Sequence, residues 1–115
     1  LKYRSDFVQQ KYSKALIGFA FERKCEFLSK PLQIDYERNL NSATEVFKGY
    51  LLAMKMIQNP TDASNYVKEM VLGTIRYSKK SSCDAVATER TNVGFDTAEN
   101  FLSLIDNELR KGVGE

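Results

Sequence analysis

The chain has no histidine among its 115 residues. Histidine is the commonest general base in enzymes and the commonest metal ligand in proteins. Its absence excludes serine or cysteine nucleophiles that depend on histidine, and it excludes the Glu-x-x-His motif of di-metal helical bundles. The sequence also lacks a nucleophile elbow, a glycine-rich phosphate loop and a calcium-binding loop. We therefore predict no catalytic residue, no cofactor and no metal site.

The sequence also lacks a large net charge of either sign, and it lacks long runs of apolar residues. The 17 Lys and Arg residues are interleaved with 15 Asp and Glu residues, which gives a net charge of +2. Nucleic-acid-binding proteins usually carry a basic face or stripe, so we expect no nucleic-acid partner. No segment approaches the roughly 18 apolar residues that cross a bilayer, so we expect no membrane span. Length and composition predict one globular domain over residues 1–115.

Only two cysteines are present, Cys25 and Cys83, and they lie far apart in the sequence. They form no Cys-x-x-Cys redox motif and are too few for a zinc site. Two interpretations remain, one structural disulfide in an oxidising compartment or two buried thiols in a cytosolic protein. We favour the disulfide. The chain begins at Leu1, and we expect a periplasmic or secreted protein whose export signal was removed, with a trimmed chain as the alternative.

The two prolines, Pro31 and Pro60, fall where helical patterns break. Apolar residues elsewhere recur at three- and four-residue spacing, and strand-like alternation is absent over any useful length. Proline suits the first position of a helix because its missing N–H is not needed there. The sequence predicts an all-α fold with four helices over residues 2–29, 31–57, 60–78 and 83–111, and a kink or division of the last helix at 91–94.

Short corners make consecutive helices antiparallel, so we predict an up-down bundle of these four helices. In that arrangement the end of the first helix and the corner before the fourth lie at the same end of the molecule. Cys25 and Cys83 occupy these two places, and a disulfide between them needs no special bending. Such a bridge closes a long loop, which corresponds to about 4 kcal/mol of stabilisation.

The second predicted helix carries an unusually regular apolar stripe, with steps of three and four residues. Its members are Leu32, Tyr36, Leu40, Ala43, Phe47, Tyr50 and Met54. A stripe with heptad-like spacing can form a seam inside one chain or between two chains. The alternative function is therefore a structural or assembly component that acts as a helical homodimer. Inward-facing positions on the third helix are Ala63, Tyr66 or Val67, Met70 or Val71, and Ile75.

Carboxylates remain as the only formal candidates for acid–base chemistry, in the pairs Asp35 with Glu37 and Glu22 with Glu26, and at Glu89. Glycosidases use two carboxyl groups in this way. Glu22 and Glu26, however, are one helical turn apart among basic residues, which is typical of a solvated face. The six tyrosines are expected to close the edge of the core with their hydroxyls in water.

The helical layout with one long-range cysteine pair resembles the small periplasmic immunity proteins of bacterial type VI secretion. The resemblance covers the architecture and the position of Cys25 within Phe21-Glu22-Arg23-Lys24-Cys25-Glu26-Phe27-Leu28. It implies a non-catalytic inhibitor that occludes the active site of a secreted peptidoglycan hydrolase. It also implies that the cysteines form a structural bridge. The polar stretch from 79 to 92 would then be the docking edge, with partner-binding residues Lys79, Lys80, Glu89 and Arg90.

Overall fold

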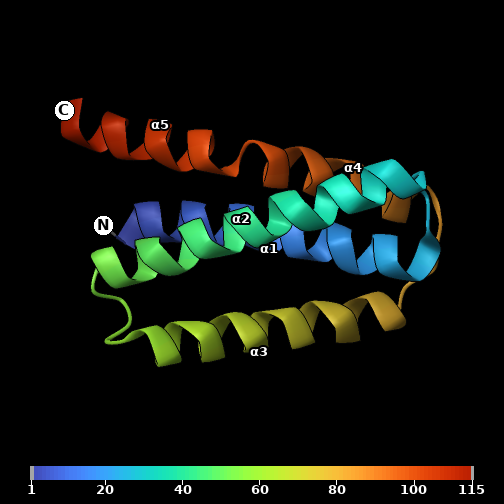
Figure 1. Cartoon of the computed structure of the whole chain (residues 1–115), viewed down its shortest axis with the longest axis horizontal. Helices are drawn as coiled ribbons and strands as arrows, with labels where there is room; N and C mark the ends of the chain where they lie inside the picture. The colour runs from blue at the N-terminus through green and yellow to red at the C-terminus, as the bar shows by residue number, and fades with distance from the viewer. Residues whose placement is uncertain (1, 115) are drawn as a thin grey trace.

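Five helices make up the part of the chain that the computed structural model describes, residues 2–114, with side chains at 7–108 and 110. They are α1 (Lys2–Cys25), α2 (Lys30–Ala53), α3 (Pro60–Lys79), α4 (Ala85–Glu99) and α5 (Phe101–Gly114). Consecutive helices run in opposite directions up to α4, and α5 continues onward from α4 (Figure 1). The all-α prediction is confirmed. The prediction of four helices is wrong, because the fourth predicted segment is two helices.

The first helix ends at Cys25, four residues before the predicted end. Glu26 has a positive φ of 54°, which takes the backbone out of the right-handed helix. The side chain of Glu22 then accepts hydrogen bonds from the amides of Phe27 and Leu28 at 3.1 and 3.2 Å. A carboxylate that satisfies two loop amides stabilises the turn and favours ending the helix here.

The second helix ends at Ala53, before the predicted end at residue 57. Lys55 has a φ of 57°, and its amide donates to the carbonyl of Leu52 while the amide of Met56 donates to that of Leu51. This pair of bonds is a Schellman motif, which usually has glycine in the left-handed position. Because lysine occupies that position instead, the sequence shows no glycine stop signal there.

The third and fourth helices begin with side-chain caps. The Oδ1 atom of Asn59 accepts from the amide of Asp62 at 2.9 Å, and Pro60 occupies the first helical turn. At α4 the cap is Asp84, whose Oδ1 accepts from the amide of Ala87 at 3.0 Å. Asparagine and aspartate are among the best N-capping residues because their short side chains reach these free amides.

The sequence predicted a break at residues 91–94. The break between α4 and α5 instead falls at Asn100. The amide group of the Asn100 side chain donates to the carbonyl of Asp96 at 2.9 Å. Asparagine disfavours helix interiors because its side chain competes in this way for backbone groups. Gly94, which prompted the expectation of a break, lies inside α4 and serves a packing role.

Gly94 lies where α4 crosses α1, directly against Gly18. A Cβ atom built on either glycine would lie 2.8 Å from the Cα of the other. The backbones of the two helices are therefore in van der Waals contact, with the Tyr36 hydroxyl beside both glycines. Among the described residues α1 packs more extensively against α4 than against any other helix. The two glycines make this close approach possible because neither has a Cβ atom.

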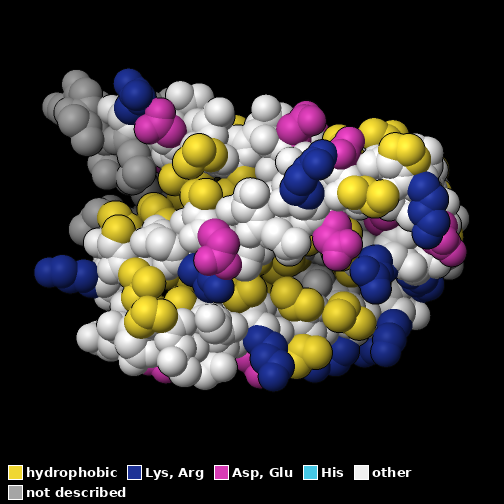
Figure 2. Space-filling view, in the orientation of Figure 1, with side chains coloured by type: hydrophobic (Ala, Val, Ile, Leu, Met, Phe, Trp, Pro, Cys, Tyr) yellow, Lys and Arg dark blue, Asp and Glu magenta, His cyan; other side chains and the backbone are white. Residues whose placement is uncertain are grey.

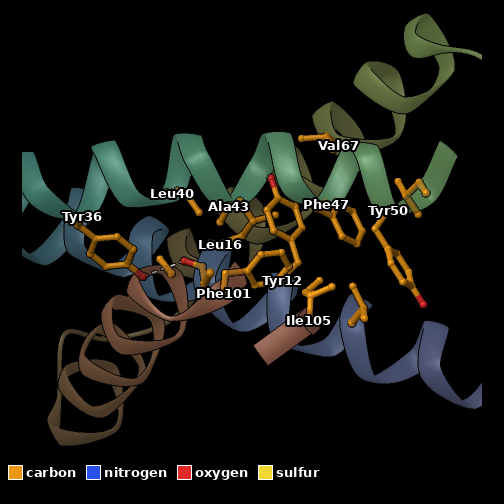
Figure 3. Close-up of a cluster of buried hydrophobic side chains, with 14 residues drawn as sticks. Tyr12, Leu16, Tyr36, Leu40, Ala43, Phe47, Tyr50, Val67, Phe101 and Ile105 are labelled. Atoms are coloured by element: carbon orange, nitrogen blue, oxygen red, sulfur yellow. Dashed lines mark hydrogen bonds between the residues drawn. The ribbon is translucent and has the colours of Figure 1, made fainter. Parts of the chain in front are cut away.

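The core is built around α1 and the inward face of α2 (Figure 3). The ring of Tyr12 stacks on Phe47 with 4.3 Å between centroids and meets Phe101 at 5.8 Å. Tyr36, also fully buried, donates its hydroxyl to the carbonyl of Ala15 at 2.8 Å. The buried part of the α2 stripe is Tyr36, Leu40, Ala43, Phe47 and Tyr50. This stripe is thus a seam within the chain.

Candidate functional site

Cys25 and Cys83 form a disulfide bond, with 5.7 Å between their Cα atoms. Cys25 is the last residue of α1, and Cys83 lies in the loop that leads from α3 to α4. These two segments meet at the same end of the molecule (Figure 1), which confirms the predicted bridge. Disulfides persist in oxidising compartments and are rare in the cytosol, so the bridge points to an extracytoplasmic environment.

Polar contacts reinforce the same end of the molecule. The Nζ of Lys24 donates to the carbonyl of Ser78 at 2.8 Å and also to that of Ser81. A lysine beside the last carbonyls of α3 is favourable because those oxygens carry partial negative charge. Lys24, which the sequence placed on a solvated face, therefore joins the end of α1 to the end of α3.

Glu22 is buried, so its assignment to a solvated face was wrong. Beyond the two loop amides, its Oε2 accepts from the Nε2 of Gln33 at 2.8 Å. The carboxylate thus connects α1, the following turn and the first turns of α2. Buried carboxylates are tolerated when hydrogen bonds replace water, and this one has the geometry of a structural group that holds a turn.

Of the other candidate carboxylates, Glu26 and Glu37 line one hollow together with Glu22, whereas Asp35 and Glu89 are not part of its lining. Asp35 forms an ion pair with Arg38 on the surface of α2, and Glu26, Glu37 and Glu89 are exposed. Among the described residues there is no cluster of three or more Cys, Asp or Glu side chains that could hold a metal ion. None of the helices in residues 2–114 has an apolar stretch long enough to cross a bilayer.

The four predicted partner-binding residues fall into two places. Lys79 ends α3 and Lys80 follows it, both exposed. Glu89 and Arg90 lie on α4, where the guanidinium of Arg90 is 5.5 Å from the ring centroid of Tyr77 on α3. This contact joins the two places across the α3–α4 corner. The docking role of the four residues stays a prediction.

Glu89 and Arg90 belong to a surface that we call the α4 patch. It consists of Val86, Glu89, Arg90 and Val93, which follow the helical spacing of one face, together with Lys14 and Ile17 of α1. A hollow of about 320 Å³ lies among these six residues. Val86 is 55% exposed and Val93 42% exposed. The patch therefore offers apolar side chains to solvent with charges of both signs around them.

A larger hollow, the α2–α3 groove, lies between α2 and α3 and has α1 as its floor. Its volume is about 590 Å³. Figure 2 shows apolar side chains gathered in the hollow between these helices, with basic side chains near one part of its border. The apolar lining is Leu16, Phe19, Ala20, Leu40, Val67, Val71 and Ile75, and the cations at one end are Arg23, Lys24 and Lys79.

The groove was missed in the sequence because its lining residues also have core spacing. Ile75 was predicted to face inward, yet it is 37% exposed and forms part of the groove wall. Tyr66 is exposed to the same extent, while Val67 is buried. The sequence contained one signal of the groove. The apolar face of α3 is wider than the area that α1 and α2 can cover, so part of it remains exposed.

Burial raises the pKa of the Tyr36 hydroxyl above its usual value near 10, and the negative charge of Glu22 raises it further. The pKa of Tyr12 is raised as well, first by burial; the hydrogen bond with Thr44 opposes that shift, and the charge of Glu45 adds to it. Both groups are therefore neutral at physiological pH and act as fixed hydrogen-bonding partners in the core.

These shifts predict a loss of stability in alkali. Below pH 10 the tyrosines are protonated in both states and their contribution is fully present. Above pH 10 the unfolded chain releases these protons while the folded protein retains them, so the free energy of unfolding falls by up to about 1.4 kcal/mol per pH unit for each buried tyrosine. Urea titrations between pH 8 and 11 measure this slope.

Tyr36→Phe removes one of the two buried hydroxyls. The free energy of unfolding should then fall less steeply with pH above pH 10, by the contribution of that one tyrosine. The same substitution at the exposed Tyr66 controls for the chemical change itself. An unchanged slope in Tyr36→Phe would contradict the assignment of the buried hydroxyl.

Comparison with known proteins gives no relative: no protein-family description, no curated protein and no solved structure matches this chain.

Proposed function

We propose that this chain is a non-catalytic binding protein of the periplasm or the extracellular space. In the most specific form of the proposal it is an immunity or inhibitor protein that occludes a secreted cell-wall-degrading enzyme. The α4 patch is the observation that carries the proposal. The disulfide adds support, since small exported domains are commonly stabilised in this way.

The α4 patch has the composition of a protein-binding surface. Val86 and Val93 are apolar and exposed, and Glu89 and Arg90 lie between them on the same helical face. Protein interfaces commonly combine exposed apolar side chains with polar ones, and arginine is enriched in them. Arg90 of the patch also contacts the ring of Tyr77 on α3, and the proposed docking residues Lys79 and Lys80 follow Tyr77 in the chain.

The alternative of a helical homodimer depends on the apolar stripe of α2 being free to join a second chain. The stripe on α2 that would join two chains is buried against α1, α4 and α5 in the single chain. A dimer built on Tyr36, Leu40 and Phe47 would have to open the core, at the cost of exposing two aromatic rings. No observation favours this alternative over the binding protein.

The test is co-purification of the protein from its native host, followed by mass spectrometry and by an activity assay of the partner. We expect a cell-wall hydrolase in stoichiometric amount whose activity falls when the protein is added. Val86→Asp combined with Val93→Asp should weaken that complex at least about tenfold, because two desolvated carboxylates replace apolar contacts.

Leu102→Asp is the matched control, since Leu102 is an exposed apolar residue on α5, outside the patch. Circular dichroism checks that all variants remain folded. Hydrolysis of a cell-wall substrate by the purified protein alone would overturn the non-catalytic proposal, and a complex unaffected by the double substitution would overturn the α4 patch as its interface.

A further inference from the structure

The α2–α3 groove is separate from the α4 patch. Tyr12, Leu16 and Phe19 of α1 face the groove, whereas Lys14 and Ile17 face the α4 patch. At about 100° per residue these two sets lie on opposite sides of α1. We propose that the groove binds one free, single-chain anionic amphiphile of the fatty-acid class, with its alkyl chain along the apolar floor and its head group beside Lys79 and Arg23.

The hydroxyl groups of the groove are already satisfied by the protein. Thr74 and Ser78 donate to the carbonyls of Val71 and Ile75 at 2.8 and 2.9 Å. The hydroxyls of Tyr12 and Thr44 bond to each other at 2.6 Å. A ligand rich in polar groups would lose its hydrogen bonds to water here and gain few in return. The floor therefore favours a hydrocarbon chain.

The charge at one end of the groove defines the head group. The lining includes Arg23, Lys24 and Lys79 and contains no Asp or Glu. Lys24 is occupied by the carbonyls at the end of α3. Lys79 and Arg23 are exposed, and within the described residues neither forms an ion pair with a carboxylate. A carboxylate or similar anion is the complement of these two cations.

The size of the groove favours a small ligand over a helix from another protein. Its 590 Å³ is within the range of about 300–1,000 Å³ for small-molecule sites. Two turns of an α-helix with side chains occupy about 850–1,200 Å³, given a diameter of 10–12 Å. The groove is recessed between two helices (Figure 2), so a flat bilayer surface would not reach its floor, whereas a free molecule can lie in it.

The experiment titrates the complete, disulfide-bonded protein with dodecanoate below its micellar concentration, followed by calorimetry and by amide NMR shifts. We expect saturable one-to-one binding, with the largest shifts along the groove at Val71, Ile75 and their neighbours. Dodecanol, which has the same chain without the charge, should bind several-fold more weakly, and dodecyltrimethylammonium more weakly still.

Arg23→Gln combined with Lys79→Gln should weaken dodecanoate binding about tenfold and leave dodecanol nearly unchanged, because two surface charges contribute on this scale. The matched control is Lys68→Gln with Arg76→Gln, which removes two exposed cations outside the groove lining. Val71→Trp, which fills the groove, should abolish binding of both ligands while circular dichroism remains unchanged.

Absence of binding below the micellar concentration would overturn the proposal. So would equal affinity for the cationic amphiphile, shifts confined to the α4 patch, or dodecanoate binding that the double glutamine variant retains. A response to anionic vesicles or to an acidic amphipathic peptide without any response to dodecanoate would assign the groove to a bilayer or to a protein segment instead. These readouts measure the binding of an amphiphile and not of a partner protein, and the inhibitor proposal is tested at Val86 and Val93, so the failure of one proposal is distinguishable from the failure of the other.

Discussion

Gly18→Ala is expected to lower the free energy of unfolding by about 3 kcal/mol or more. The added methyl group would clash with the carbonyl oxygen of Arg90, with the hydroxyl of Tyr36 and with the Cα of Gly94. Two of these three obstacles are backbone atoms of α4, so no rotamer change can relieve them. The helices would have to separate, and the hydrogen bond from Tyr36 to Ala15 would be disturbed with them.

Gly49→Ala and Gly73→Ala are the matched controls. Both glycines lie inside helices, and apart from the surrounding backbone of their own helix nothing lies within 4 Å of a Cβ built on either of them. Alanine should therefore stabilise the protein at these positions by up to about 1 kcal/mol through helix propensity. Urea unfolding followed by circular dichroism measures all three variants. Equal effects at Gly18 and Gly49 would contradict the close crossing of α1 and α4.

Removing the disulfide should cost about 4 kcal/mol. The bond joins residues separated by 58 positions, and closing a loop of this length restricts the unfolded chain by that amount. Cys25→Ser with Cys83→Ser should show the loss in urea titrations without reductant. Dithiothreitol should produce a similar loss in the wild-type protein and have no effect on the double variant. Identical midpoints for oxidised and reduced wild type would contradict this account.

The reduction experiment also shows how strongly the folded protein depends on an oxidised bond. A loss of about 4 kcal/mol is a large share of the 5–15 kcal/mol typical of a folded domain. Cys83 is exposed, so a reducing cytosol would have access to the bond. A protein that depends on this bond for its stability is suited to an oxidising environment.

The features that the sequence predicted correctly are those with local or periodic signals. The helical class, the helix starts at Pro60 and within one residue of Pro31, and the inward stripe of α2 from Tyr36 to Tyr50 follow from spacing and from proline chemistry. The meeting of Cys25 with Cys83 follows from helix direction alone, because antiparallel packing brings alternate corners together.

The features that were missed depend on what a side chain meets in three dimensions. Glu22 looks like a surface charge in a basic segment, and only the turn that follows it supplies the amides that make burial tolerable. Tyr12 and Tyr36 were expected at the edge of the core, yet Thr44 and the carbonyl of Ala15 provide partners for their hydroxyls inside it. The groove, likewise, arises from the distance between α2 and α3, which residue spacing does not encode.

The contact of Gly18 with Gly94 also determines how the molecule can adapt to a ligand. At this crossing the two backbones touch, and the Tyr36 hydroxyl lies beside both glycines, so α1 and α4 cannot move closer together without a clash. The walls of the groove on α2 and α3 carry side chains that can change rotamer, whereas its floor lies on α1, which is packed against α4. We therefore expect a ligand in the groove to be accommodated by movement of the wall side chains, with little change in the surface formed by α4.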